Sequence, residues 1–221
     1  MLRVGLTGGL GSGKSAVSAI FSELGAAVLS ADDVARRLMQ PGEEVYAAIV
    51  CQFGGGVVQP DGALDRGRLA RLAFEQDQGP ALNRIVHPAT VAAEEEWMAA
   101  LRKQNPAAIA IVESALIFEV EKWGTAPGWV SHFDRIILVT APEQLKLERV
   151  IARAIRASGG DESRRAILER DARARMALQI PDREKLDRCD FVIANHGSLA
   201  EMRSQVESIY ARLLAENVGY P

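Results

Sequence analysis

Residues 8–15 have the types and spacing of a loop that binds polyphosphate. They read Gly-Gly-Leu-Gly-Ser-Gly-Lys-Ser and fit the pattern G-x-x-x-x-G-K-[ST]. The glycines allow backbone angles that a Cβ would block, so successive N–H groups can turn inward around an anion. The Lys14 ammonium can reach β- and γ-phosphates, and the Ser15 hydroxyl is placed to ligate Mg²⁺. The residues predicted to contact a nucleoside triphosphate in this phosphate-binding loop (P-loop) are Gly11, Ser12, Gly13, Lys14, Ser15 and Ala16.

The segments on both sides of the P-loop are those that such a loop needs. Residues 2–7 form a short apolar run, typical of a buried strand, and residues 14–24 carry apolar side chains at helical spacing. A helix that begins near Gly13 directs its unpaired N–H groups and positive dipole end at the bound phosphates. A dinucleotide-binding loop would need G-x-G-x-x-G, and no register of this loop supplies it.

Acidic residues follow two further apolar runs. Asp32 and Asp33 come after residues 26–30, and Glu113 ends residues 108–113. Open α/β sheets bind ligands at the carboxyl ends of their strands, which is where these carboxylates would lie. A carboxylate there can orient an attacking hydroxyl and accept its proton, and it can also favour a helix N-terminus. We favour catalysis for Asp32 and the helix N-terminal role for Asp33. Glu113 is predicted to hold Mg²⁺ through water.

Short apolar runs recur along the chain, separated by segments of helical spacing. This alternation predicts an α/β fold in three layers, with a parallel sheet covered by helices on both faces. The predicted strands are 2–7, 26–30, 108–113, 135–140 and 191–194. The predicted helices include 14–24, 31–39, 143–153, 163–179 and 199–213.

Two parts of the chain interrupt the alternation. Residues 41–105 hold only helical patterns and are far longer than an ordinary crossover, which favours a helical insertion that covers a substrate. Residues 149–188 contain ten Arg and one Lys against seven Asp and Glu, with Ser-Gly-Gly at 158–160 as a flexible joint. Such a segment can close over phosphates as a lid. It can also be a solvated helix with ion pairs such as Glu169–Arg173 and Asp171–Arg175, and we expect both.

Smaller features give further predictions. Pro60-Asp61-Gly62 predicts a turn, and Val86-His87-Pro88 predicts the end of one helix and the start of another, with His87 as a cap. The histidines have no metal-ligand spacing. Cys51 and Cys189 are too few for a disulfide framework, so we expect small core residues.

Composition excludes several classes of protein. A length of 221 residues is compatible with one domain, and a net charge of −3 gives no electrostatic case for a nucleic-acid or membrane partner. The first residues do not have the pattern of a signal peptide, and no apolar stretch approaches the 18 or so residues of a membrane span. We therefore expect a cytoplasmic protein.

Together these motifs resemble the dephospho-CoA kinase family, which catalyses the last step of coenzyme A biosynthesis. The resemblance runs along nearly the whole chain, and the order and spacing of the motifs carry it. Thr7-Gly8-Gly9 opens the P-loop as in the family, and Ser30-Ala31-Asp32 resembles its acidic motif. The remaining matches are Asp61 to Phe74, Ile85 to Pro88, Glu113 to Glu119, Arg149 with Arg153, Arg175 to Lys185, and Asp190 to Asn195.

The resemblance implies ATP and Mg²⁺ as cosubstrates and the ribose 3′-hydroxyl of dephospho-CoA as acceptor. It also implies a core of about residues 1–40, 106–150 and 189–221, a CoA-binding insertion of about 41–105 and a lid of about 151–188.

By position in the family motifs, Asp32 becomes the base or hydroxyl-orienting residue. Arg149 and Arg153 become clamps for the phosphates, and Asn195 is placed near the adenine of ATP. The chain departs from the family where Ser30 and Glu113 each replace an Asp and Ala115 replaces a Pro, and its lid segment is long. Since one carboxylate remains at position 32, activity is expected.

Two alternatives stay open at this point. One is another small-molecule P-loop kinase acting on a nucleoside monophosphate, shikimate or gluconate, although the long segment 41–105 disfavours the compact members. The other is an ATP-binding regulatory switch. A GTP switch would normally carry Asn-Lys-x-Asp, which this sequence lacks.

Overall fold

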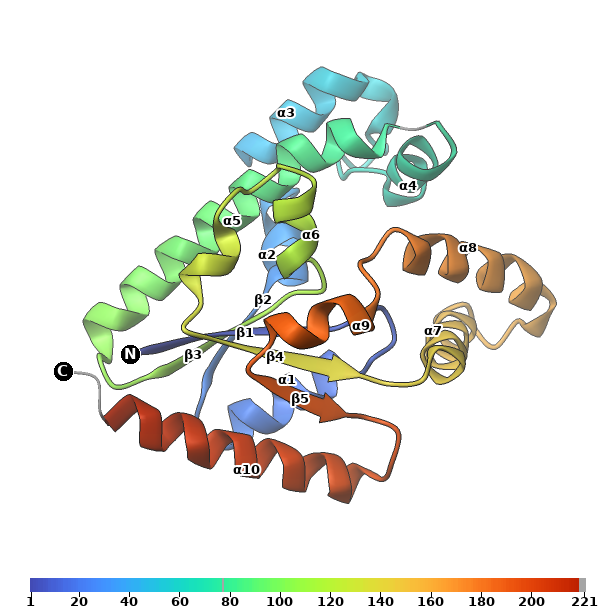
Figure 1. Ribbon diagram of the computed structural model, residues 1–221. Helices are drawn as coiled ribbons and strands as arrows, with labels where there is room; N and C mark the ends of the chain where they lie inside the picture. Colours follow the sequence, from blue (N-terminus) through green and yellow to red (C-terminus); the bar gives the residue numbers. More distant parts are fainter. Residues whose placement is uncertain (77, 219–221) are drawn as a thin grey trace.

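The computed structural model describes residues 1–76 and 78–218, and a parallel sheet lies at its centre (Figure 1). Within these residues the five strands have the order β2-β3-β1-β4-β5. The strands are β1 (Leu2–Thr7), β2 (Ala27–Ser30), β3 (Ile109–Glu113), β4 (Arg135–Thr140) and β5 (Phe191–Ala194). Val4 of β1 is in register with Ile111 on one side and Arg135 on the other, so the P-loop leaves the middle of the sheet. The predicted strands are confirmed, with β2 and β3 each shorter by one residue at the start.

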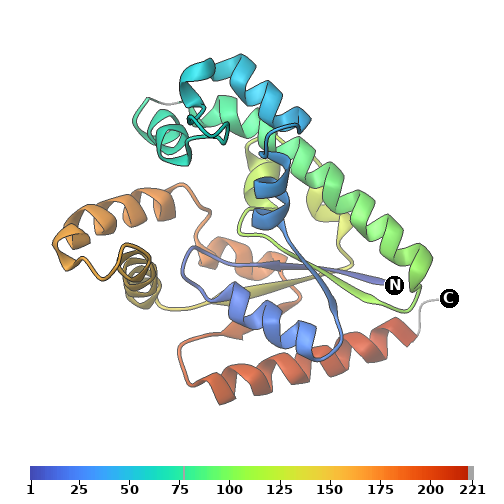
Figure 2. The same ribbon diagram turned by 180° about the vertical axis from the view of Figure 1, so that it is seen from behind.

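Helices cover the sheet on both faces, which confirms the predicted three-layer α/β fold (Figures 1 and 2). On one face, α1 (Lys14–Glu23) and α10 (Leu199–Val218) pack against alternate strand residues such as Ile111 and Ile137. On the other face lie α5 (Gly79–Gln104) and α6 (Ile117–Lys122). They pack against the strand residues adjacent to these in sequence, Val112 and Ile136, whose side chains point to this face. This alternation follows from the two-residue period of a strand.

A group of helices projects beyond the sheet and has its own apolar cluster. It comprises α3 (Glu44–Phe53), α4 (Arg66–Glu75) and the first half of α5, next to α2 (Ala31–Leu38). The buried residues of its cluster are Val45, Ile49, Val57, Leu64 and Leu69. The predicted turn at 60–62 is confirmed, and Gly62 adopts a φ of 86° there.

The predicted break at residues 86–88 is wrong, because α5 runs without interruption from Gly79 to Gln104 with Pro88 inside it. An internal proline removes one helical hydrogen bond and costs about 3 kcal/mol. Packing offsets this cost on both sides of the proline: Leu82 and Ile85 join the cluster of the projecting helices, while Val91 and Met98 join the cluster on the sheet. His87 consequently lies within the helix and does not cap one.

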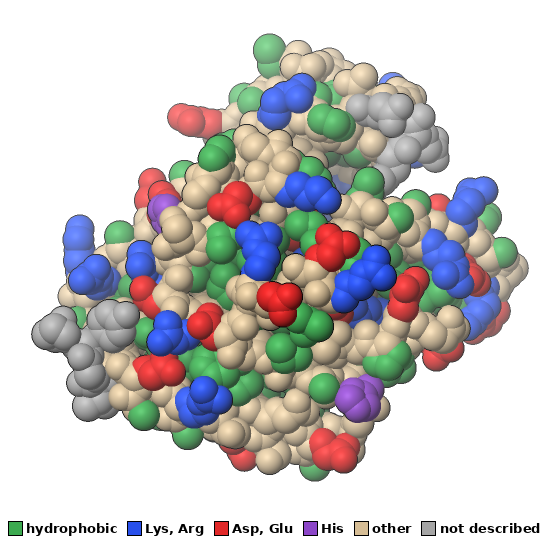
Figure 3. Space-filling view, in the orientation of Figure 1, with side chains coloured by type: hydrophobic (Ala, Val, Ile, Leu, Met, Phe, Trp, Pro, Cys, Tyr) green, Lys and Arg blue, Asp and Glu red, His purple; other side chains and the backbone are tan. Residues whose placement is uncertain are grey.

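The arginine-rich segment forms a pair of helices, α7 (Glu143–Ala157) and α8 (Arg165–Ala177), called here the α7–α8 pair. Gly159 and Gly160 have positive φ and form the predicted joint between the helices. The ion pair Glu169–Arg173 is confirmed at 2.8 Å, whereas Arg175 lines a cavity. Figure 3 shows basic and acidic side chains interspersed over α8, at the right of the molecule. The remaining short elements are α9 (Asp182–Lys185) and the 3₁₀ turns Gly55–Val57, Trp129–His132, Glu162–Arg164 and Leu186–Arg188.

The prediction that both cysteines are core residues is wrong for Cys51, which is exposed. Helix α3 buries Val45 and Ile49, and Cys51 lies two positions beyond Ile49, on the opposite side of the helix. Cys189 is half-buried against the cluster on the sheet. Among the described residues, no helix combines the length and the apolar character that a membrane crossing requires.

Candidate active site

The P-loop connects the carboxyl end of β1 to the start of α1 and is closely packed. Gly11 and Gly13 have φ of 81° and 95°. A Cβ on Gly11 would collide with the backbone carbonyl of Lys146, and one on Gly13 would collide with the side-chain amide of Asn195. Helix α7 and the end of β5 therefore press on the loop from outside and determine its shape.

Lys14 lies at the start of α1 with its ammonium turned back over the loop. Its Nζ donates to the carbonyl oxygen of Gly8 at 2.8 Å and to that of Gly9 at 3.4 Å. Burial lowers the pKa of Lys14 from its ordinary value, and the carboxylates of Glu113 and Asp32 act in the opposite direction. The ammonium is thus largely shielded from solvent and lies near two carboxylates. A rotation of the side chain would bring it to a phosphate bound in the loop.

Two serines of α1 hold the carboxylate at the end of β3. Ser15 Oγ donates to Glu113 Oε1 at 3.1 Å, and Ser18 Oγ donates to Glu113 Oε2 at 3.0 Å. Strand β3 lies beside β1, so the end of β3 faces the helix that follows the P-loop. Asp32 lines the same hollow of about 450 Å³. Hydroxyl and carboxylate oxygens are the ligands that Mg²⁺ prefers, so this donor set fits the ion.

Asp32 and Asp33 have different surroundings. Ser30 Oγ accepts the backbone N–H of Asp33 at 3.3 Å and caps α2, and the Asp33 carboxylate pairs with Arg36 at the surface. Neither carboxylate is needed as the side-chain cap of this helix. Asp32 lines both the hollow next to Glu113 and the larger cavity at the P-loop.

A cavity of about 910 Å³ opens beside the P-loop and brings most of the predicted site residues together. The predicted residues that line it are Gly11, Gly13, Lys14, Ser15, Ala16, Asp32, Glu113, Arg149 and Arg153. Arg175 of α8 and Arg84 of α5 line it as well, so cations approach from the α7–α8 pair and from the projecting helices. The sequence did not single out Arg84.

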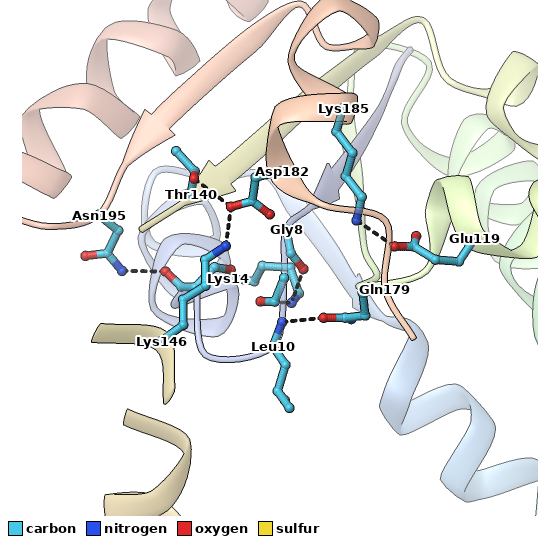
Figure 4. A network of polar contacts seen from close by, with 12 residues as sticks. Gly8, Leu10, Lys14, Glu119, Thr140, Lys146, Gln179, Asp182, Lys185 and Asn195 are labelled. Carbon is cyan, nitrogen blue, oxygen red and sulfur yellow. Dashed lines mark hydrogen bonds and ion pairs between the residues drawn. The ribbon is translucent and has the colours of Figure 1, made fainter. Parts of the chain in front are cut away.

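Ser12 and Asn195 lie behind the loop and do not line the cavity. Asn195 Nδ2 donates to the carbonyl oxygen of Ser12 in the P-loop at 2.8 Å (Figure 4). Asn195 Oδ1 accepts from Arg149 at 3.4 Å. The Asn195 side chain therefore links the end of β5 to the P-loop and to α7. In the described structure it contacts the loop itself.

Sequence reasoning gave no role to the residues that tie the P-loop to the segment after α8. Gln179 Oε1 accepts the backbone N–H of Leu10 at 2.7 Å (Figure 4). Lys146 pairs with Asp182, and Asp182 also accepts from Thr140 Oγ1 at 2.6 Å. These contacts join residues far apart in the sequence, so local spacing carries no signal for them.

A fully buried ion pair fixes the same segment against α6. Lys185 Nζ lies 2.7 Å from Glu119 Oε1, and both side chains have no exposed surface. Glu119 Oε1 also accepts the backbone N–H of Ile180 at 3.0 Å. The pair thus holds residues 180–185 beside the end of β3, close to the cavity.

Comparison with known proteins decides the family. The family model described as dephospho-CoA kinase matches residues 2–201. The chain belongs to the dephospho-CoA kinase family. A dephospho-CoA kinase from Syntrophotalea carbinolica is 40% identical over 97% of this chain and 93% of its own length.

Solved structures agree with this assignment. Dephospho-CoA kinase from Campylobacter jejuni has a TM-score of 0.66 and 25% identity, covering 97% of this chain and 98% of that one. The protein TT1252 from Thermus thermophilus has a TM-score of 0.70 and 30% identity, covering 96% of this chain and 97% of that one. The chain is accordingly a phosphotransferase of CoA biosynthesis that acts on dephospho-CoA, and no finding favours the two alternatives.

Proposed function

We propose that the P-loop binds Mg²⁺-ATP and that Asp32 directs the ribose 3′-hydroxyl of dephospho-CoA at the γ-phosphate. One observation carries the proposal: Lys14, Ser15, Asp32 and Arg149 line a single cavity of about 910 Å³. Phosphoryl transfer needs mainly positioning and neutralisation of charge, and this cavity offers a carboxylate for the alcohol and cations for the phosphates.

The proposed reaction is a direct displacement. The 3′-oxygen bonds to the γ-phosphorus, the bond from that phosphorus to the β–γ bridging oxygen breaks, and ADP leaves. Asp32 accepts the proton of the hydroxyl. Lys14, Arg149 and Arg153 stabilise the charge on the transferring group, and the backbone N–H groups of residues 11–16 hold the phosphates.

The proposed metal residues are Ser15, as a direct ligand, and Glu113, through water. Bound Mg²⁺ would neutralise phosphate charge during transfer. The hydrogen bonds from Ser15 and Ser18 already orient the Glu113 carboxylate toward the start of α1. The replacement of an Asp by Glu113 is therefore accommodated by a second hydroxyl, one helical turn further along.

We further propose the division of the chain suggested by the family. Residues 1–40, 106–150 and 189–221 form the core, although residues 219–221 lie outside the described part. Residues 41–105, of which residue 77 lies outside the described part, bind the CoA precursor, and residues 151–188 form the lid. Helix α7 spans the boundary between core and lid, so a lid motion would be transmitted along that helix. Asn195 would lie near the adenine of ATP, on the β5 side of the loop.

We also propose a cytoplasmic setting without a nucleic-acid or membrane partner. Both cysteines are free thiols, and exposed Cys51 would favour a reducing compartment. The net charge of −3 supports a small-molecule substrate rather than a polyanionic partner.

A phosphorus-31 NMR spectrum of the protein with Mg²⁺-ATP and dephospho-CoA tests the proposal. A new 3′-phosphomonoester resonance should appear together with ADP. Equal release of ADP with shikimate, gluconate or a nucleoside monophosphate would favour another kinase. Binding of ATP without acceptor-stimulated ADP release would favour a regulatory switch.

A further inference from the structure

Trp123 forms part of the cavity wall and packs against a second ring. Its side chain is 38% exposed, and it lines the cavity directly after α6. The His87 ring stacks against it, with centroids 5.8 Å apart and an interplanar angle of 17°. His87 itself is not among the residues that line the cavity. The indole is thus a lining residue whose ring packs against a second ring.

Hydrogen bonds fix the orientation of the His87 ring. Thr125 Oγ1 donates to the carbonyl oxygen of Val120 at 3.1 Å, so it accepts from His87 Nδ1, 3.0 Å away. This assigns the proton of the neutral ring to Nδ1. Burial lowers the pKa of His87 to about 4, so the ring is uncharged at neutral pH. Trp123 therefore packs against a neutral ring that is itself held by hydrogen bonds.

The sheet order places this wall on the acceptor side of the P-loop. Asp32 follows β2, and Trp123 follows α6 after β3, so both lie on the same side of β1. Asn195 follows β5, on the other side of β1. A triphosphate in the P-loop therefore separates the two sides, and the nucleotide whose hydroxyl meets Asp32 occupies the side of Trp123.

The chemistry of the acceptor requires a surface for a flat ring on that side. In a nucleotide the base and the 3′-hydroxyl are attached to the same ribose, so a hydroxyl at Asp32 places the base one ribose away from that carboxylate, in the cavity that Trp123 also lines. An indole face is a general stacking surface for bases, whereas the amide-containing pantetheine arm has no aromatic ring to stack. Arg84 lines the same cavity and can pair with the diphosphate of the acceptor.

We propose that Trp123, backed by His87 and Thr125, is a stacking platform for the purine ring of the acceptor nucleotide. The platform makes the enzyme select acceptors that carry a purine next to the reacting ribose. This inference rests on the proposed function, since it names the part of the same cavity that recognises the acceptor base.

Steady-state kinetics of Trp123→Ala and Trp123→Phe test the platform. The acceptors are dephospho-CoA and adenosine 5′-monophosphate, which has the purine and ribose but no pantetheine. Trp123→Ala should raise the KM of both acceptors by a factor of about 5 to 150, the range expected for loss of base stacking. Trp123→Phe keeps an aromatic face and should cause a much smaller rise. The KM of ATP should not change in either variant.

The matched control is Leu199→Ala, which truncates a side chain that is 66% exposed at the start of α10. It should leave every KM unchanged. A rise for dephospho-CoA alone would mean that Trp123 contacts the pantetheine arm, and it would overturn the platform. A rise in the KM of ATP would also overturn the platform. An unchanged KM for both acceptors in Trp123→Ala would overturn it as well.

Fluorescence separates failure of the platform from failure of the proposed function. With the protein saturated by a non-hydrolysable ATP analogue, adenosine 5′-monophosphate should quench tryptophan emission, and Trp123→Phe should abolish the quenching. This readout needs no turnover. Wild-type protein that quenches but does not phosphorylate dephospho-CoA would retain the platform and reject the function. Turnover with quenching unaltered in Trp123→Phe would reject the platform alone.

Discussion

The backbone N–H of Leu10 donates to Oε1 of Gln179 at 2.7 Å, across 169 residues of sequence. The side chain of Leu10 packs against the apolar cluster of the α7–α8 pair. The tip of the P-loop is thus attached to these helices through both its backbone and its side chain. A displacement of α8 and the residues directly after it would therefore move the tip of the P-loop.

We predict that Gln179→Leu impairs both the binding of ATP and turnover. It removes the acceptor and leaves the Leu10 N–H unpaired in a partly buried place, at a cost of about 1–3 kcal/mol. The KM of ATP should rise and kcat should fall, each measurable by ADP release. The control is Gln144→Leu on the exposed face of α7, where the amide donates to Glu148. Identical kinetics for the two variants would show that the Leu10 contact has no role.

Lys14→Ala should remove most turnover and leave the fold largely intact. The substitution deletes a positioning charge, whereas the loop backbone is still held by α7, β5 and Gln179. Thermal unfolding should occur near the wild-type temperature while ADP release collapses. Turnover close to that of wild type would exclude Lys14 from the reaction.

Asp32→Asn should lower kcat by roughly 10²- to 10⁴-fold, the range for loss of a general base. ATP affinity should change little, because the substitution is nearly isosteric and lies on the acceptor side. Asp33→Asn is the matched control, since Asp33 pairs with Arg36 at the surface. If Asp33→Asn were the slower enzyme, the catalytic role would move to Asp33.

Because Lys185 and Glu119 form a buried ion pair, we predict that the effects of their substitutions on the free energy of unfolding are not additive. Lys185→Met leaves the Glu119 carboxylate buried without its cation, and unfolding free energy should fall by about 3–5 kcal/mol. The double variant Lys185→Met, Glu119→Leu removes both charges and should be more stable than the single variant. Urea titrations of the wild type, Lys185→Met, Glu119→Leu and the double variant measure the coupling. Additive losses would show that the two charges do not depend on each other.

Glu94 predicts a loss of stability as pH rises. Its side chain on α5 is 1% exposed, and burial raises its pKa to about 8, with a smaller contribution from Glu95. The unfolded carboxyl ionises near pH 4.5, so between pH 4.5 and 8 the folded state binds more protons than the unfolded state. This difference destabilises the fold by about 3 kcal/mol between pH 5 and pH 8.

Glu94→Gln carries no titrating proton and should flatten this part of the stability curve. Urea unfolding at pH 5 and pH 8 measures the difference between variant and wild type. The advantage of the variant should be larger at pH 8. An equal difference at both pH values would contradict a raised pKa for Glu94.

The fold and the P-loop were predictable because short-range rules determine them. Glycines and a lysine at fixed offsets specify the loop, and buried parallel strands are continuous apolar runs. These rules located all of the strands within one residue. They also placed Asp32 and Glu113 at the same edge of the sheet, where the structure has them.

The failures have a different physical origin. Pro88 lies inside α5 because packing on both sides of it outweighs a local preference, and a local pattern does not contain that packing. Likewise, the partners of Leu10 and Lys146 come from distant segments that meet only in the folded chain. Nothing in the sequence singled out Trp123 for the site, because this tryptophan belongs to no motif with a defined spacing.

The amide of Asn195 is bonded to Ser12 and occupies the space that a side chain at position 13 would need. The loop after β1 is therefore completed by a residue that follows β5, at a separation of 183 positions in the sequence. Since Asn195 reaches the loop only when β5 lies in the sheet beside β4, the loop acquires this support together with the complete five-stranded sheet of the described residues.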